Sequence, residues 1–333
     1  MTRPMKALMK LSLGADDVAL RPRAMPELTP GHALVRVTAV GLCGSDVHAI
    51  KAHPGYEWVR TPVTLGHEIT GVVTDVAHGA GSVPAGSHVG VISMDGCRAC
   101  DLCSAGRRPL CAERTVIGLS HHGGAAEYVS VRTDNLVLLP TELSWQHAVL
   151  LEPCSVAVHA VTRTPLPASG RVIVSGAGPV GMLTAFAARA RGAEVTVVGV
   201  QQDEAVRLPL LRECGFGTRT VAPDEPVDTW IEASGSVAAL ADAVCGLRAG
   251  GDLTAVGMYD RLASVDGSRL VRREITVRGS YGSVHADYRT ALDLLSTAVV
   301  PADRMVFPFA LDEWAAALEA IAHGTAIKAA LRP

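Results

Sequence analysis

The hydrophobic pattern of the 333-residue chain changes near residue 145. Before that point, short and partly alternating apolar segments are separated by glycine and proline. These segments lie at 33–40, 69–76, 88–93, 127–131 and 136–140. Closely spaced strands with such turns and little helix are typical of a barrel-like β domain.

After residue 145 the pattern alternates between short apolar runs and stretches with helical spacing. The runs predict strands at 171–175, 194–199, 229–234, 252–257 and 275–279. Helices are expected at 145–162 with an interruption at Pro153, and at 182–191, 204–214, 238–247, 288–298 and 311–323, before a last strand at 327–331. Strands alternating with helices predict an α/β domain with a doubly wound parallel sheet.

A glycine-rich segment joins the first of these strands to a helix. It reads Gly176-Ala-Gly178-Pro179-Val180-Gly181 and fits the pattern Gly-x-Gly-x-x-Gly in the strand-to-helix context that the motif requires. The first glycine allows the tight turn, the second lets the backbone approach a pyrophosphate, and the third lets helix and strand pack closely. The segment predicts a dinucleotide site, with the pyrophosphate at a helix N-terminus.

The choice between NAD and NADP stays open. An NAD site usually places Asp or Glu about 20 residues after the glycines, where the carboxylate holds the ribose 2′-hydroxyl. Here the second strand ends at Gly199, and the first acid after it is Asp203. Arg207 is nearby, but there is no arginine cluster for a 2′-phosphate.

Composition excludes several classes of function. Hydrophobic residues make up 48% of the chain and charged residues 19%, the net charge is −3, and no basic block is present, which argues against nucleic-acid binding. No run of 18 apolar residues predicts a membrane span. The first residues lack the features of a secretory signal, so we expect a cytoplasmic protein that acts on a small molecule.

Four of the eight cysteines are clustered: Cys97, Cys100, Cys103 and Cys111. In a reducing compartment such clusters indicate metal ligands before disulfides. Four thiolates with no open position describe a closed structural zinc site. An iron–sulfur cluster would also use four cysteines, but nothing else in the chain indicates electron transfer.

A second group of reactive side chains lies earlier in the chain. It consists of Cys43, Ser45, Asp46, His48, His67 and Glu68. Thiolate, imidazole and carboxylate are zinc ligands, and a catalytic zinc needs three of them plus an open position. Glycines beside Cys43 and His67 predict turns that orient these side chains. We therefore hypothesise a catalytic metal site.

Taken together in chain order, these motifs resemble the zinc-dependent medium-chain alcohol and polyol dehydrogenases. The resemblance rests on Cys43-Gly-Ser-Asp-Val-His48, Gly66-His-Glu68, the four-cysteine segment, Glu152-Pro153 and the glycine motif, and it spans nearly the whole chain. It implies a GroES-like catalytic domain made of residues 1–152 and 283–333 and a Rossmann domain of residues 153–282.

The resemblance also implies residue roles. Cys43, His67, Glu68 and Glu152 are the expected ligands of the catalytic zinc, with Cys154 as an alternative to Glu152. Asp46 would orient the liganding histidine. Ser45 and His48 would carry the proton of the substrate alcohol away from a zinc that lowers the pKa of its bound hydroxyl. Tyr56 and Trp58 either line the substrate pocket or cover the core.

The expected function is hydride transfer between a secondary alcohol of a polyol, sugar or aminocyclitol and NAD or NADP. L-threonine 3-dehydrogenase and simple alcohol dehydrogenase are alternatives within the class. A zinc-free reductase and a non-catalytic nucleotide-binding protein on the same fold belong to different classes, and neither would need both metal sites. The resemblance further implies two zinc ions per chain and a homodimer or homotetramer.

Overall fold

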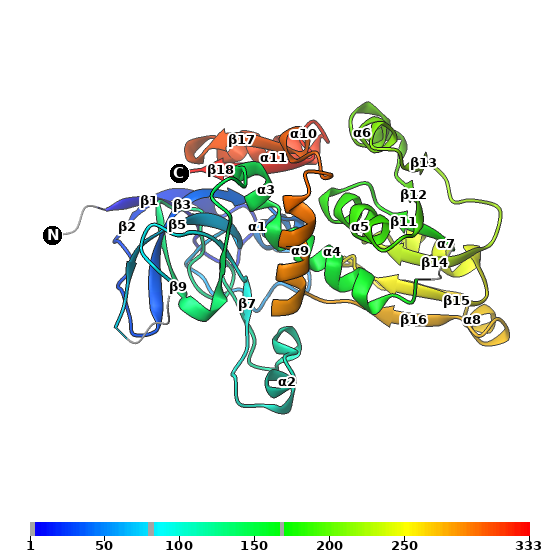
Figure 1. The fold of residues 1–333 in the computed structure, drawn as a ribbon, viewed down its shortest axis with the longest axis horizontal. Helices are drawn as coiled ribbons and strands as arrows, with labels where there is room; N and C mark the ends of the chain where they lie inside the picture. The colour runs from blue at the N-terminus through cyan, green and yellow to red at the C-terminus, as the bar shows by residue number, and fades with distance from the viewer. Residues whose placement is uncertain (1–3, 79–82, 167–169) are drawn as a thin grey trace. The chain divides into compact units, whose positions relative to one another are not determined.

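The computed structural model describes residues 4–78, 83–166 and 170–333. The described residues form two compact units (Figure 1). Unit 1 comprises Met1–Glu152 and Val284–Pro333, and unit 2 comprises Pro153–Ser283. Among the described residues, no helix has the length and apolar character needed to cross a membrane.

Unit 1 is built around a seven-stranded sheet that contains both N-terminal and C-terminal segments. The strand order is β10-β6-β5-β3-β18-β17, and β9 also pairs with β3. The strands are β3 (His32–Gly41), β5 (Glu68–Val76), β6 (His88–Val91), β9 (Tyr128–Arg132), β10 (Leu136–Leu138), β17 (Val306–Ala310) and β18 (Lys328–Arg332). A smaller sheet contains β1 (Met5–Lys10), β2 (Val18–Arg23) and β4 (Val63–Thr64).

The core of unit 1 follows from alternation along these strands. In β3, the side chains of Ala33, Val35 and Val37 are buried, and the residues between them are more exposed. They pack with Ile69 and Val73 of β5 in the main hydrophobic cluster. The prediction that this part of the chain is rich in β-strands is therefore confirmed, and β3 and β5 form the centre from which the candidate site extends.

The helices of unit 1 lie in the stretches that connect these strands. They include α1 (Gly44–Ile50), α2 (Asp101–Ser104), α3 (Trp145–Val149), α9 (His285–Ser296), α10 (Ala302–Met305) and α11 (Trp314–Ala322), with α4 (Leu151–Arg163) running from unit 1 into unit 2. The predicted interruption at Pro153 is wrong. The break falls at Leu150, and Pro153 lies in the first turn of α4, where a missing N–H removes no intrahelical bond.

Residues 43–50 also differ from the prediction of turns. They form the start and body of α1, with Cys43 as the N-cap. The Asp46 carboxylate accepts a hydrogen bond from the Cys43 N–H (2.9 Å), which satisfies one of the unpaired donors at the helix start. The reactive side chains of this segment therefore lie on a short helix that is anchored at its N-terminus.

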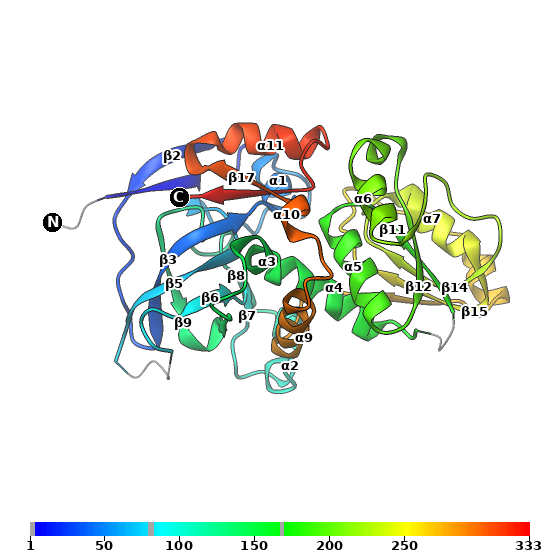
Figure 2. The ribbon, with the colours of Figure 1, turned by 45° about the horizontal axis from the view of Figure 1, so that its top comes forward.

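Unit 2 contains a six-stranded parallel sheet in the order β13-β12-β11-β14-β15-β16. Figure 2 labels β11, β12, β14 and β15 of this sheet. The strands are β11 (Arg171–Ser175), β12 (Glu194–Val198), β13 (Gly217–Arg219), β14 (Val227–Glu232), β15 (Leu247–Ala255) and β16 (Thr276–Gly279). Its helices include α5 (Pro179–Ala190), α6 (Arg207–Glu213), α7 (Val237–Gly246) and α8 (Gly267–Arg272). This order is that of a doubly wound dinucleotide-binding sheet, which confirms the predicted Rossmann fold.

Candidate active site

The pairing of β3 with β5 brings three metal-ligand side chains together. Gly41 at the end of β3 lies opposite Glu68 at the start of β5. Cys43 follows the first strand and His67 precedes the second, so both lie at the same end of the pair. One ligand atom from each of Cys43, His67 and Glu68 lies within 4.8 Å of the other two. The donors are a thiol sulfur, an imidazole nitrogen and a carboxylate oxygen, a set that suits zinc.

Gly41 makes room for this arrangement. A Cβ atom at this position would overlap the Glu68 carboxylate. Any larger residue would push Glu68 away or separate the two strands. The glycine before Cys43 therefore matters for the space it leaves beside Glu68.

Asp46 links the start of α1 to His67. The Asp46 side chain is fully buried, and its Oδ1 lies 3.4 Å from His67 Nδ1. This distance fits an ion pair but not a well-aligned hydrogen bond, and neither atom has another hydrogen-bond partner among the described residues. The contact orients the imidazole so that Nε2, its other nitrogen, faces Ser45 Oγ at 3.3 Å.

The contact between Asp46 and His67 favours the ionised forms of both side chains. Burial lowers the pKa of His67, but Asp46 and Cys43 outweigh it and raise that pKa well above its usual value. Burial raises the pKa of Asp46, but His67 and the Cys43 N–H outweigh it and hold that pKa below its usual value. Because a metal binds the neutral imidazole, zinc binding at His67 would release a proton.

Glu68 has a buried partner that sequence reasoning missed. Lys328 Nζ lies 2.6 Å from each Glu68 carboxylate oxygen and 3.1 Å from the Leu42 carbonyl oxygen. Both side chains are almost completely buried. Burial lowers the pKa of Lys328, but Glu68 and Cys43 outweigh it and raise that pKa. The sequence signal was a lysine inside the apolar strand 327–331.

Glu152 and Cys154 occupy different surroundings. Glu152 Oε1 accepts a hydrogen bond from Ser93 Oγ (2.7 Å), and burial raises the pKa of Glu152. Among the described residues, the cluster of metal-ligand atoms comprises Cys43, His67 and Glu68, without Glu152. Cys154 is fully buried, and desolvation raises the pKa of its thiol to about 12. Among the described residues, Cys154 is likewise not part of this cluster of metal-ligand atoms.

His48 lies on α1, three residues beyond Ser45. Its ring stacks on Tyr56, with ring centroids 5.3 Å apart and planes inclined by 14°. Tyr56 in turn stacks on Trp58, whose side chain is 40% exposed. Trp58 therefore does not belong to the core, whereas Tyr56 is partly buried against it.

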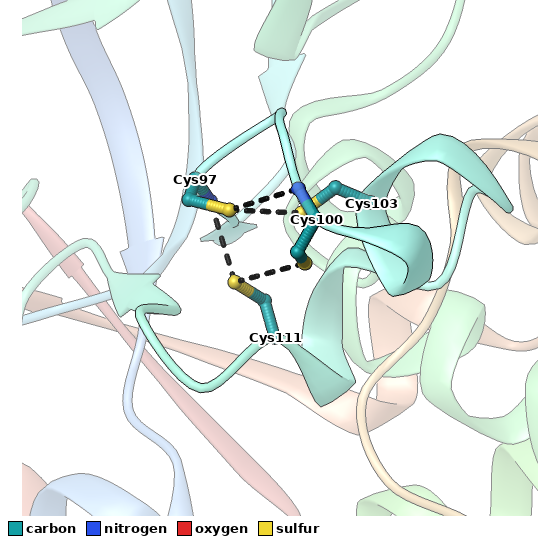
Figure 3. Close-up of side chains that lie close together, drawn as sticks. All are labelled: Cys97, Cys100, Cys103 and Cys111. Atoms are coloured by element: carbon teal, nitrogen blue, oxygen red, sulfur yellow. Dashed lines mark hydrogen bonds between the residues drawn. The ribbon is translucent and has the colours of Figure 1, made fainter.

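The four clustered cysteines also converge (Figure 3). They lie on the loop that includes α2 (Asp101–Ser104) and η1 (Arg108–Leu110). The Sγ atoms of Cys97 and Cys103 are 3.9 Å apart, and those of Cys100 and Cys111 are 3.8 Å apart. Zinc–sulfur bonds of about 2.3 Å in a tetrahedron require sulfur separations of about 3.8 Å. The geometry therefore fits one tetrahedral zinc ion.

The glycine-rich segment in unit 2 forms a strand-to-helix turn. Gly176 follows β11 with φ of +101°, Gly178 is the N-cap of α5, and Pro179 is at the first helical position, where proline is favoured. A Cβ at Gly181 would overlap the Gly176 carbonyl oxygen, whereas at Gly178 it would meet no described atom within 4 Å. Close packing at Gly181 and open space at Gly178 fit a bound pyrophosphate.

Asp203 does not lie where an NAD-binding acid is expected. Its Oδ2 accepts a hydrogen bond from the Val200 N–H (2.9 Å), and its Oδ1 accepts one from Arg207 (2.8 Å). The carboxylate is buried and caps the turn after β12. Val200, which follows Gly199 beyond the end of β12, is 61% exposed. An apolar side chain thus lies near the strand end where a ribose-binding acid would be placed.

Comparison with known proteins agrees with this geometry. Residues 29–141 match the Alcohol dehydrogenase GroES-like domain, and residues 179–297 match the Zinc-binding dehydrogenase family. A sorbitol dehydrogenase of Halalkalibacterium halodurans is 33% identical, with 99% of both chains covered. An L-threonine 3-dehydrogenase of Streptomyces avermitilis is 32% identical, with 84% of both chains covered.

A solved structure supports the same assignment. A zinc-binding dehydrogenase of Sinorhizobium meliloti 1021 bound to NADP has a TM-score of 0.89 and is 28% identical, with 99% of both chains covered. Together with the converging donors and the glycine turn, these matches show that the chain belongs to the zinc-dependent medium-chain alcohol and polyol dehydrogenase family and is an oxidoreductase of that class.

Proposed function

We propose that the protein oxidises a secondary alcohol of a polyol, sugar or aminocyclitol with NAD or NADP, and catalyses the reverse reduction. The observation that carries the proposal is the convergence of Cys43, His67 and Glu68 within 4.8 Å at the end of one strand pair. The similarity to a sorbitol dehydrogenase supports a polyol substrate. The similarity to an L-threonine 3-dehydrogenase makes L-threonine the second candidate.

Two sets of residues would hold zinc. Cys43 and His67 are the first ligands of the catalytic ion, Glu68 and Glu152 are the acidic candidates, and the four clustered cysteines would hold a structural ion. A bound catalytic zinc supplies a Lewis acid at the substrate hydroxyl, and bound nicotinamide supplies the hydride acceptor. Lys328 binds both carboxylate oxygens of Glu68 and holds this side chain in place. We therefore expect Glu68 to lie next to the ion in the resting enzyme.

The side chains of α1 would position the imidazole and carry a proton. Asp46 holds the orientation of His67, as outer carboxylates do for metal-binding histidines. Ser45 Oγ, beside His67 Nε2, is placed to take the proton that the substrate hydroxyl loses. His48 lies three residues further along α1 and therefore on the same helix face, where it can act as the base that receives this proton.

The glycine turn would hold the dinucleotide. Gly176, Gly178, Pro179, Val180 and Gly181 surround the N-terminus of α5, where free N–H groups favour an anion. Gly199 lies at the end of the neighbouring strand, where the adenosine ribose is expected. Because Val200 carries no charge and Asp203 is already paired, we propose that the protein accepts both NAD and NADP.

We also propose that copies of the chain associate as dimers or tetramers. Among the described residues, β16 pairs on one side only, with β15. Leu262, Val271 and Val277 in and before this strand expose apolar side chains. An open strand edge beside apolar surface favours association. Light scattering of wild type and Val277→Lys would test this.

None of the eight cysteines forms a disulfide, which favours a cytoplasmic location.

A substrate panel tests the proposed function. Alcohols, polyols, amino sugars and L-threonine would each be offered with NAD and with NADP while nicotinamide absorbance is followed. We expect about two zinc ions per chain and turnover of a polyol-type substrate. Cys43→Ala should abolish hydride transfer and leave cofactor binding intact. Retained turnover in that variant would refute the site, and exclusive turnover of L-threonine would favour the second candidate.

A further inference from the structure

The end of α1 brings a second histidine against His48. The His53 N–H donates to the His48 carbonyl oxygen (3.0 Å), and the Ala52 N–H donates to the Ala49 carbonyl oxygen (3.2 Å). Ala52 has φ of +53°. These features define a Schellman cap, in which the residue two beyond the C-cap faces the third residue from the helix end. Here those two residues are His53 and His48.

The two imidazoles are directly hydrogen-bonded. Nδ1 of His48 and Nδ1 of His53 are 2.8 Å apart, and the ring centroids are 5.0 Å apart. A hydrogen bond between two imidazole nitrogens needs one N–H and one lone pair, so the two Nδ1 atoms share a single proton. Two groups of the same chemistry joined in this way can exchange that proton in either direction.

The histidine pair is partly exposed to solvent. Both histidines are only partly buried, and the face of His48 is covered by Tyr56. The other ionisable side chains of this segment are engaged separately: Lys51 pairs with Asp16 (2.9 Å), and Glu57 accepts from the Gly55 N–H (3.0 Å). Because Lys51 and Glu57 have other partners, His53 is the ionisable side chain of residues 51–57 that is seen to hydrogen-bond to Nδ1 of His48.

We propose that His53 is a positioning residue that completes a two-histidine proton relay and delivers the substrate proton to water. The proposal rests on the proposed function, in which His48 receives that proton. When His48 gains a proton on Nε2, its Nδ1 proton passes to Nδ1 of His53. His53 then releases its Nε2 proton to water. One proton enters the pair and one leaves it, neither ring is oxidised or reduced, and each ring ends in the tautomer opposite to its starting one. Exchange of the ring protons with water restores the starting tautomers before the next turnover.

A glutamine variant separates the relay from a structural cap. His53→Gln keeps the backbone cap and a hydrogen-bonding side chain but cannot pass a proton on. In the zinc-loaded enzyme at low buffer concentration, we expect kcat for alcohol oxidation to fall on the order of tenfold, less than for a group that itself transfers the proton to or from substrate. Added HEPES base should restore most of kcat, and the cofactor Kd should not change.

The matched control is His88→Gln, which removes an exposed histidine at the start of β6. It should behave as wild type at every HEPES concentration. An unchanged kcat in His53→Gln, or a loss that HEPES does not reverse, would overturn the relay. If the glutamine variant does not fold, His53→Asn takes its place with the same expected results.

A measurement without substrate distinguishes failure of the relay from failure of the proposed function. Histidine ¹⁵N NMR of the wild-type holoenzyme should show coupling between two Nδ1 atoms through one shared proton, and its absence would overturn the relay. If wild type shows this coupling but oxidises no alcohol, the proposed function fails while the histidine pair stands.

Discussion

The Lys328 ammonium group lies 2.6 Å from both carboxylate oxygens of Glu68, although 260 residues separate the two in the chain. Both side chains are buried beside Cys43 and His67. A buried charge is tolerated only when it is paired and hydrogen-bonded. The last strand of the chain thus supplies the charge that allows an acid to lie beside the candidate zinc site.

Removing Lys328 should destabilise unit 1 strongly. Lys328→Met leaves the Glu68 carboxylate buried without its partner, and breaking a buried pair in this way costs roughly 3–5 kcal/mol. The free energy of unfolding from urea titration should fall by about that amount. The double variant Lys328→Met with Glu68→Gln should recover much of the loss, and equal stability of both variants would contradict the pairing.

The four-cysteine site should contribute to stability separately from activity. Cys103→Ser should lower zinc content from about two ions per chain to about one. A ligand present at about 1,000 times its Kd stabilises the folded protein by about 4 kcal/mol. Losing this contribution from the structural zinc should lower Tm by roughly 10 °C. Turnover well below the new Tm should persist.

The control for this variant is Cys245→Ser, since Cys245 is exposed and lies outside both cysteine-containing groups. Its zinc content and Tm should equal those of wild type. If Cys103→Ser instead retained two zinc ions, the four thiols would not form one site.

Much of the fold could be predicted because buried parallel strands read as continuous apolar runs between turn signals. β11 occupies the predicted residues 171–175. In contrast, the sequence pattern does not predict α8 (Gly267–Arg272), since this helix has only 6 residues, none of them buried, and is too short to show a helical period. The two glycines that flank Cys43 predict turns in place of α1, whereas the Asp46 cap stabilises a helix there.

The sequence could predict the candidate metal ligands but not the side chains that pair with them. Cys43 and His67 have chemical types and spacing that indicate a metal. The partner of Glu68 depends on how β18 (Lys328–Arg332) pairs with the end of β3, a tertiary contact with no local signal. The same holds for Asp203, whose role as a cap rather than a ribose ligand is decided by the turn after β12.

Cys154 should resist alkylation in the folded protein. Burial raises the pKa of its thiol to about 12, so at pH 8 almost none of it is thiolate, and the side chain is also closed to solvent. Iodoacetamide followed by peptide mass spectrometry should label the exposed Cys245 and leave Cys154 unmodified. Labelling of Cys154 after zinc chelation, without unfolding, would instead indicate that it is a metal ligand.

Val200 should control the preference between the two nicotinamide cofactors. A carboxylate at the end of β12 would accept hydrogen bonds from the ribose hydroxyls of NAD and repel the 2′-phosphate of NADP. A hydrogen bond to a charged group contributes about 1.5–3 kcal/mol, so Val200→Asp should raise the ratio of kcat/KM for NAD over NADP by at least about tenfold. Steady-state kinetics with both cofactors measures this ratio. Val200→Asn, which adds no charge, should change it less, and an unchanged ratio in Val200→Asp would place the ribose away from this strand end.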